Sequence, residues 1–384
     1  MTPKTRLCIV MGSHWDAQMG GAQYQAKCLV EVLARRPDVE TYYLARRVLQ
    51  PLRRDGYEIV RFGTRRRGVG RFLSDLWSLY RALDKLRPAV IYQRGLKIYT
   101  GVCAFYCLRR GARLVFHIAH DSDVSRAQFA NWSAAMLVRR LERCIAEYGM
   151  RRANVIVAQT RDQARMLRSE FGLEATAVVP NFHPLPAGAT PRRDDGRMRV
   201  LWVANFKKRK NPEIFVDLAE AFLEWNDVRF VMIGRAGGEV YAQLHERMKH
   251  LGNLEYLGEL PIERVNEELA QSDIFVNTSS AEGFPNTFIQ AWLRGTPVVS
   301  CFVDPDACLS QGHGGIVTGS PARLISVIGE LLDNRARIRE LGDQARAHGY
   351  ANHHPDCAQR LVELLLNDGN CPPRQESTPQ RLSC

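Results

Sequence analysis

The residue types between positions 280 and 299 could bind a ligand that carries both negative charge and hydroxyl groups. An acid, Glu282, precedes a glycine turn and a helix expected at Thr287–Arg294, between buried strands expected at Ile274–Val276 and Val298–Cys301. The start of a helix offers unpaired backbone N–H groups and a positive dipole end, which suit an anion. Glu282 would repel that anion unless the ligand also donates hydroxyl groups, and a nucleotide-sugar has both.

A glycine pair marks a second possible ligand contact. Gly20 and Gly21 follow a strand expected at Leu7–Met11 and come directly before a helix. Glycine lets the backbone approach a ligand closely, although a plain tight turn would explain the same pair.

Two histidines are placed at or just after the strand expected at Arg113–His117. Ligands of open α/β sheets bind at the carboxyl ends of the strands, so His117 or His120 could reach one, or could make only a structural hydrogen bond. We favour His120 because it lies further past the strand. Asp121 could orient His120 or interact with the acceptor of a reaction.

Strands that alternate with helices would position these residues. In the first half, strands are expected at Leu7–Met11, Thr41–Leu44, Ile59–Phe62, Val90–Tyr92, Arg113–His117 and Val155–Ala158, and helices at Gln23–Arg36, Phe72–Lys85, Gly101–Arg110, Trp132–Arg152 and Arg161–Phe171. In the second half, strands are expected at Val200–Val203, Phe230–Ile233, Leu254–Leu257, Ile274–Val276 and Val298–Cys301, and helices at Glu213–Trp225, Val240–His250, Ile262–Leu269, Thr287–Arg294, Ala322–Leu332, Ala336–His348 and Cys357–Leu366. This alternation predicts an α/β protein with two parallel sheets that face each other across one cleft.

The segment that begins at Glu282 resembles the signature of the retaining glycosyltransferases of family 4 (glycosyl transferases group 1), which have the GT-B fold. That pattern reads Glu-Gly-Phe-Gly/Pro, then a second acid eight residues after the first, then Gly-Thr-Pro-Val-Val. The chain matches it at both ends, but Gln290 stands in place of the second acid. Glutamine keeps hydrogen-bonding capacity without the charge.

The resemblance implies two Rossmann-like domains with defined boundaries. We expect an acceptor-binding domain at 1–181, a linker rich in Pro, Gly and Arg at 182–198, and a nucleotide-sugar-binding domain at 199–350. Residues 351–366 would form a helix that packs back on the first domain, and the polar residues 367–384 are expected to be disordered. Asn181 falls in a Val-Pro-Asn sequence that is similar to one in the family, where we expect a structural role.

The same resemblance assigns roles to residues. Glu282 would hold hydroxyl groups of the donor sugar, Gln290 the ribose, and His120 the sugar at the reaction centre. Lys210 falls where the family has a lysine, and it would stabilise the charge of the departing diphosphate. Asn205 replaces the family's arginine, so Lys207 or Arg209 could supply that charge; a solvated basic loop is the alternative. The remaining predicted donor-binding residues are Gly20, Gly21, Asn205, Gly234, Gly283, Phe284, Pro285, Asn286 and Thr287.

The composition fits a globular protein that is long enough for two cores, with 384 residues of which 45% are hydrophobic and 24% charged. No apolar run approaches the ~18 residues of a membrane-spanning helix, and we expect a cytoplasmic protein. The ten cysteines include no Cys-x-x-Cys pair, so we expect mostly buried thiols, Cys144 among them, with Cys371 and Cys384 exposed. No metal site or other cofactor is expected, and His353 and His354 are expected at the surface.

The charge is divided unevenly between the two halves. Residues 1–195 hold 33 Lys and Arg against 17 Asp and Glu, whereas residues 196–384 hold 20 against 24. A basic first half suggests an anionic partner, and a membrane surface fits better than nucleic acid, for which no binding module is recognised. We therefore expect a saccharide or lipid-linked acceptor at the inner face of the cell membrane.

Two other functions stay open at this point. A GT-B nucleotide-sugar epimerase usually needs further acids and histidines in the second domain, where His313 is the only histidine nearby. A non-catalytic partner that binds nucleotide-sugar is the other, and the departures at Gln290 and Asn205 favour it.

Overall fold

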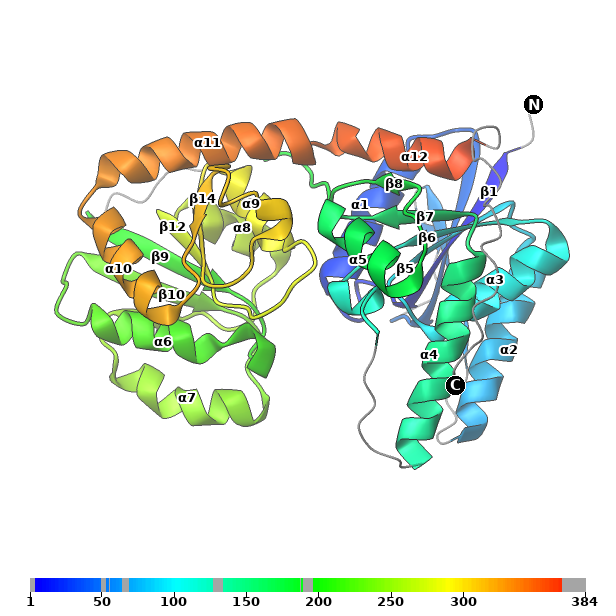
Figure 1. The fold of residues 1–384 in the computed structure, drawn as a ribbon, viewed down its shortest axis with the longest axis horizontal. Coiled ribbons are helices and arrows are strands. Elements are labelled where there is room, and N and C mark those ends of the chain that lie inside the picture. Colours follow the sequence, from blue (N-terminus) through cyan, green and yellow to red (C-terminus); the bar gives the residue numbers. More distant parts are fainter. Residues whose placement is uncertain are drawn as a thin grey trace.

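The computed structural model describes residues 4–49, 53–54, 56–63, 69–126, 134–186, 188 and 196–367, which form two α/β lobes (Figure 1). The first lobe is built on an eight-stranded sheet of order β3-β4-β2-β1-β5-β6-β7-β8, and the second on a six-stranded sheet of order β11-β10-β9-β12-β13-β14. Neighbouring strands are parallel except β3 and β4. The predicted fold class is confirmed.

The elements of the first lobe follow the expected alternation. The strands are β1 (Thr5–Ser13), β2 (Val39–Arg47), β3 (Arg53–Arg54), β4 (Tyr57–Arg61), β5 (Val90–Arg94), β6 (Arg113–His117), β7 (Val155–Ala158) and β8 (Ala177–Val178). The helices are α1 (Gly21–Leu33), α2 (Val69–Leu86), α3 (Ile98–Arg110), α4 (Ala134–Arg152) and α5 (Arg161–Phe171).

The second lobe alternates in the same way, and its long last helix leads the chain back to the first lobe (Figure 1). The strands are β9 (Met198–Val203), β10 (Val228–Ile233), β11 (Leu254–Tyr256), β12 (Ile274–Asn277), β13 (Val298–Ser300) and β14 (Gly315–Val317). The helices are α6 (Pro212–Ala221), α7 (Gly238–His250), α8 (Ile262–Ala270), α9 (Asn286–Trp292), α10 (Pro321–Leu332), α11 (Arg335–His353) and α12 (Ala358–Leu366).

The central strand of the first sheet shows why these apolar runs form strands that are covered on both faces. Leu7, Ile9 and Met11 of β1 lie in the apolar layer that includes α1 and α12, whereas Cys8 and Val10 lie in the layer that includes α2 and α3. Successive side chains of a strand point to opposite faces, so an uninterrupted apolar run suits a strand buried on both sides. Each such burial stabilises the fold by roughly 1.5–3 kcal/mol.

The second sheet repeats this arrangement around β9. Val200 and Trp202 lie in the layer that includes α6 and α10, and Leu201 lies in the layer that includes α8 and α9. The polar residues that follow β9, β10 and β12 therefore emerge together at the carboxyl edge of the sheet, where open α/β sheets bind ligands.

The lobes are joined by two crossings of the chain and by a capped helix. After β8 the chain passes Phe182 and His183, both buried, and after α11 it returns to the first lobe, where α12 packs on α1 (Figure 1). The carboxylate of Asp306 also accepts hydrogen bonds from the backbone N–H groups of Arg161 and Asp162, each at 2.8 Å. It caps α5 from the opposite lobe, at the helix end that favours an anion.

Some expectations failed and others fall outside the described residues. The short strands β3, β8 and β14, of two or three residues each, were not predicted. Cys144 is exposed rather than buried, since α4 meets α3 through Ile145 and Gly149 instead. Residues 368–384 of the predicted tail, with Cys371 and Cys384, and residues 187 and 189–195 of the predicted linker lie outside the described ranges. Among the helices of those ranges, none has the length and apolarity that a bilayer crossing requires.

Candidate functional site

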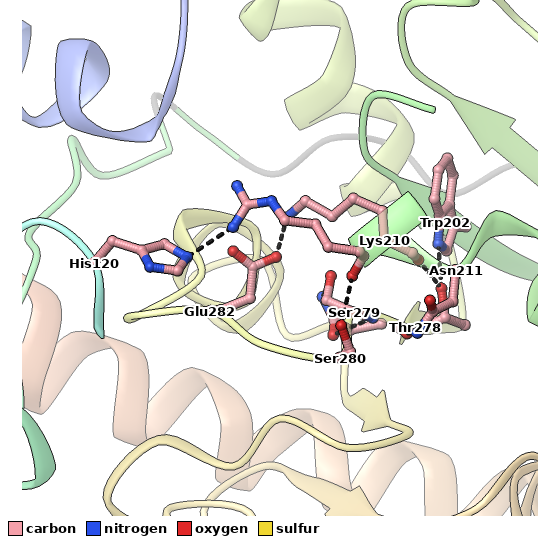
Figure 2. A network of polar contacts seen from close by, with 10 residues as sticks. His120, Trp202, Lys210, Asn211, Thr278, Ser279, Ser280 and Glu282 are labelled. Carbon is pink, nitrogen blue, oxygen red and sulfur yellow. Dashed lines mark hydrogen bonds and ion pairs between the residues drawn. The ribbon is translucent and has the colours of Figure 1, made fainter. Parts of the chain in front are cut away.

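The four basic residues 207–210 after β9, which we call the basic turn, are fixed in place by the loop that follows β12. The Thr278 hydroxyl donates a hydrogen bond to the carbonyl of Lys210 at 2.6 Å, and the side-chain amide of Asn211 donates to the carbonyl of Thr278 at 2.9 Å. The indole N–H of Trp202 donates to the same hydroxyl oxygen at 2.9 Å. These contacts hold Lys210 against the loop that carries Glu282 (Figure 2).

Lys210 and Glu282 form an ion pair at the carboxyl edge of the second sheet (Figure 2). Their side chains are only 18% and 11% exposed. Burial lowers the pKa of Lys210 to about 7, and the positive charges of Arg209 and Lys207 add to the shift. The carboxylate of Glu282 favours the charged lysine, so we take the ammonium group to be protonated while the pair is intact. A phosphate that replaced the carboxylate would meet a poorly solvated cation, which attracts it strongly.

His120 of the first lobe faces the same turn. Its Nε2 lies 2.7 Å from Nη1 of Arg209, and its Nδ1 accepts a hydrogen bond from the backbone N–H of Ser122 at 3.1 Å. Burial, with a smaller contribution from Arg209, lowers the pKa of His120, so the ring is neutral at pH 7. A neutral imidazole has one donor and one acceptor nitrogen and cannot accept from both neighbours. The contact with Arg209 is therefore the one that a ligand could displace, which would leave Nε2–H free to donate.

Gly283 brings the loop of the second lobe against the loop that carries His120. A Cβ at Gly283 would lie 2.9 Å from the amide nitrogen of Gln163 and 3.2 Å from the carbonyl oxygen of Ala119. Glycine therefore permits this close approach. On the loop of His120, the carboxylate of Asp121 accepts a hydrogen bond from the side chain of Gln163 at 3.0 Å, and burial raises the pKa of Asp121. The structure thus brings the three predicted catalytic residues and the predicted acceptor residue to one place.

Asn286, the first residue of α9, is occupied by contacts between the lobes. Its Oδ1 accepts hydrogen bonds from Gln25 at 3.0 Å and from Asn181 at 3.1 Å, and its Nδ2 donates to the carbonyl of Gly21 at 3.1 Å. A Cβ at Gly21 would lie 3.0 Å from that amide nitrogen, so glycine at this position allows α1 to pack closely on α9. The donor-binding role of these residues stays a prediction.

The rest of the signature lies deeper in the second lobe. Gln290 is buried and donates to the side chain of Asn266 in α8 at 2.7 Å. Pro285 is buried, and Phe284 and Thr287 are partly buried. A ribose at Gln290 would have to share that amide with Asn266, so this role too stays a prediction.

Asn205 and Gly234 shape the turns that follow β9 and β10. Oδ1 of Asn205 accepts a hydrogen bond from the backbone N–H of Arg235 at 3.0 Å. Gly234 has a φ of 156°, and a Cβ there would collide with the carbonyl of Ala204. Both residues therefore join the two strand ends, whereas Lys207 is exposed at the start of the basic turn.

Behind the site lies a buried polar group that the sequence did not reveal, which we call the junction cluster: Arg94, His117, Asn181, Asn286 and His353. Arg94 donates to the side-chain oxygen of Asn181 at 2.6 Å, and its Nη1 lies 3.0 Å from Nδ1 of His117. Nδ1 of His353 donates to the carbonyl of Asn181 at 2.7 Å. The available signal was Arg94, a charged residue two positions after the strand expected at Val90–Tyr92 and the last residue of β5.

The prediction that His353 lies at the surface is wrong. Its side chain is 2% exposed, because α11 ends against the segment by which the chain leaves the first lobe. Burial lowers the pKa of His353 to about 4. Within the described ranges, no group of three or more His, Cys, Asp or Glu side chains is arranged to hold a metal ion.

Two family models match the chain, one in each lobe. The model described as Glycosyltransferase Family 4 matches residues 19–185, and the model described as Glycosyl transferases group 1 matches residues 197–334.

Curated proteins and a solved structure are similar over different spans. The Vi polysaccharide biosynthesis protein VipC/TviE of Salmonella typhi is 30% identical over 147 residues, which are 38% of this chain and 25% of that protein. The D-inositol 3-phosphate glycosyltransferase of Nocardia farcinica is 27% identical over 274 residues, which are 64% of this chain and 60% of that protein. Neither alignment reaches two thirds of the relative's length. The crystal structure of Anabaena HepE in complex with UDP and glucose has a TM-score of 0.72 at 16% identity, and the superposition covers 94% of this chain and 99% of that one, which shows a shared fold.

Proposed function

Because the chain belongs to the family 4 (group 1) glycosyltransferases and has their GT-B fold, we propose that it transfers a sugar from a nucleoside diphosphate sugar to a hydroxyl group of an acceptor. The observation that carries the proposal is the ion pair of Lys210 with Glu282, next to the contact of Arg209 with His120. Cations suit the diphosphate, and a carboxylate and an imidazole suit the hydroxyl groups of the sugar.

The basic turn would do the electrostatic work of the reaction. When the bond between the sugar and the diphosphate breaks, negative charge develops on the departing phosphate oxygens. Lys210 and Arg209 would move from Glu282 and His120 to those oxygens, and preorganised charges of this kind lower the barrier. In this proposal, Lys210 and Arg209 stabilise the departing diphosphate without a metal ion. In support, the HepE structure that shares the fold holds UDP and glucose.

We propose that the anomeric configuration is retained. The acceptor oxygen would attack the sugar carbon from the face that the diphosphate leaves, so that one carbon–oxygen bond forms as the other breaks. The proton of the acceptor would pass to an oxygen of the departing diphosphate. Glu282 and the neutral His120 would hold the sugar hydroxyl groups, and the protein would act mainly by positioning both substrates.

The acceptor belongs to the first lobe in this proposal. Asp121 lies on the loop of His120 and is half-buried beside Gln163, so it could accept a hydrogen bond from an acceptor hydroxyl. The similarity to a protein named for Vi polysaccharide biosynthesis supports a saccharide acceptor. We propose a lipid-linked or surface saccharide, met at the inner face of the cell membrane.

The two alternative functions have less support. His313, which an epimerase could use, stacks instead on His348, with ring centroids 4.8 Å apart. The substitutions at Gln290 and Asn205, which favoured a non-catalytic partner, both make hydrogen bonds within the protein. Gln290 and Asn205 therefore each have a structural role that explains the departure from the family pattern without a loss of activity, and the transferase proposal stays the stronger one.

Turnover of candidate donors tests the proposal. Thermal shift against UDP, GDP and ADP identifies the base first, since a ligand at 100 times its dissociation constant stabilises by about 2.7 kcal/mol. Glu282→Gln keeps the shape of the side chain and removes its charge, so donor hydrolysis should fall by at least ~100-fold. Glu255→Gln, at an exposed position of β11, is the matched control.

Two results would count against transfer. Unchanged hydrolysis in Glu282→Gln would remove that residue from the site. Tight binding of a nucleotide-sugar without any turnover by the wild-type protein would favour the non-catalytic partner.

A further inference from the structure

Three helices of the first lobe carry large apolar side chains that face solvent. Eight of the fourteen exposed large apolar residues in the described part of the chain lie on them. Trp77, for example, is 61% exposed. We call the set the helix surface: Leu73 and Trp77 of α2, Phe105 and Leu108 of α3, and Leu137, Val138, Leu141 and Tyr148 of α4. Scattered apolar residues are ordinary on a protein surface, but a concentration of this kind marks an interaction site.

The helices are packed so that these side chains form connected stripes. Leu73 and Trp77 are one turn apart on α2, and Trp77 connects to Phe105 of α3 through Tyr80, with ring centroids 6.1 Å and 5.9 Å apart. Leu137, Leu141 and Tyr148 follow one face of α4 at helical spacing. Figure 1 shows the amino-terminal ends of α2 and α4 extending to the same side of the first sheet.

Basic side chains are interleaved with the apolar ones. The guanidinium of Arg109 lies 5.8 Å from the ring of Phe105, and that of Arg152 lies 5.9 Å from the ring of Tyr148. Further exposed basic residues on the three helices are Arg81, Lys85 and Arg139. Three of the four acids on these helices are paired with arginine, namely Asp75 with Arg46, Asp84 with Arg110 and Glu147 with Arg143. The fourth, Glu142, is partly buried. The helix surface is therefore both apolar and positively charged.

We propose that the helix surface docks on an anionic lipid bilayer. Leucine and tryptophan side chains would enter the boundary between head groups and acyl chains, and arginine and lysine would contact lipid phosphates. A second copy of this chain suits the surface less, because a symmetric dimer would bring two positively charged faces together. This inference deepens the proposed function, on which it rests, by naming the surface through which a membrane-bound acceptor is reached.

The helix surface is connected to the candidate site through one side chain. Arg143 of α4 donates hydrogen bonds to the backbone carbonyls of Ser122 at 3.1 Å, Asp123 at 3.3 Å and Ser125 at 2.9 Å. These residues belong to the loop that carries His120 and Asp121. A bilayer that contacts α4 therefore lies one helix away from the loop of His120 and Asp121, where the acceptor is proposed to bind.

Vesicle flotation tests the proposal with the full chain. The wild-type protein should float with vesicles of phosphatidylcholine and phosphatidylglycerol, and much less with phosphatidylcholine alone, at low salt. The variants Trp77→Ser and Leu141→Ser should lose flotation, whereas Leu223→Ser, at an exposed apolar position of the second lobe, should keep it. Arg81→Gln or Lys85→Gln should each weaken binding about fivefold, since a basic residue near the surface contributes roughly 1 kcal/mol. Arg339→Gln on α11 is the charge control.

The outcomes separate this inference from the proposed function. Hydrolysis of a soluble donor should be unchanged in Trp77→Ser and Leu141→Ser, and unchanged melting temperatures would show that both variants fold. Flotation that survives both substitutions, or equal binding to neutral and anionic vesicles, overturns the docking surface while leaving transfer intact. A wild-type dimer in sedimentation experiments that dissociates in these variants would also overturn the proposal, because the surface would then be an interface between two copies of the chain.

Discussion

Two polar clusters lie at the boundary between the lobes, and they differ in how replaceable their partners are. At the candidate site, Lys210 meets Glu282 and Arg209 meets the neutral His120. These side chains are not fully buried, and a ligand could separate them. In the junction cluster, the partners are buried protein groups, as in the contact between Arg94 and Asn181. Both clusters combine histidine with a cation, so residue type alone does not distinguish a ligand-binding site from a structural cluster. The distinction lies in whether a ligand could displace the contacts or whether they are buried within the protein.

The largest expected effect separates the clusters by activity. Lys210→Met removes a cation from the candidate site, so transfer should fall by at least ~100-fold, and the melting temperature should also fall because Glu282 is left largely buried without its partner. Lys208→Met, at an exposed position of the same basic turn, is the matched control and should keep full activity. Steady-state rates measure the activity of the two variants, and thermal unfolding measures their stability. An equal loss of activity in both would mean that the turn acts only through its total positive charge and that Lys210 has no specific role.

The second effect concerns stability. Asn181→Ala removes the side chain that accepts from Arg94 and donates to Asn286, so the free energy of unfolding should fall by about 1–3 kcal/mol. Asn352→Ala, on the exposed side of α11, should change it by less than about 0.5 kcal/mol. Urea unfolding measures both. A stable Asn181→Ala protein that has lost donor binding would move Asn181 from the junction cluster to the site.

The third effect is a pH dependence of stability, which appears only below neutral pH. Burial lowers the pKa of His353 to about 4 from 6.5, so below pH 6.5 the unfolded chain gains a proton that the folded chain excludes. Stability is therefore lost as the pH falls from 6.5 toward 4, by up to about 1.4 kcal/mol per pH unit. His353→Gln, which keeps a donor for the carbonyl of Asn181, should flatten this loss, and the exposed His250→Gln should not. Urea midpoints across that pH range provide the measurement, and identical slopes in the two variants would contradict it.

The sequence predicted best what depends on neighbouring residues. The bounds of β6 and β7 match the prediction, because an apolar run bounded by polar residues is a local signal, and His120 was placed from the end of β6 alone. The junction cluster could not be predicted in this way. His353 and Asn181 are 172 residues apart in the chain, and their contact exists only because α11 returns to the first lobe. The same long-range contacts explain why Asn286, four residues after Glu282, joins the lobes in this structure.

The central claim is that a sugar diphosphate displaces two contacts at the candidate site, the ion pair of Lys210 with Glu282 and the contact of Arg209 with His120. A crystal structure with an unreactive nucleotide-sugar tests it most directly. The account predicts phosphate oxygens on Lys210 and Arg209, with Glu282 and His120 released to hydroxyl groups of the sugar. A ligand bound elsewhere while Lys210 still pairs with Glu282 would contradict it.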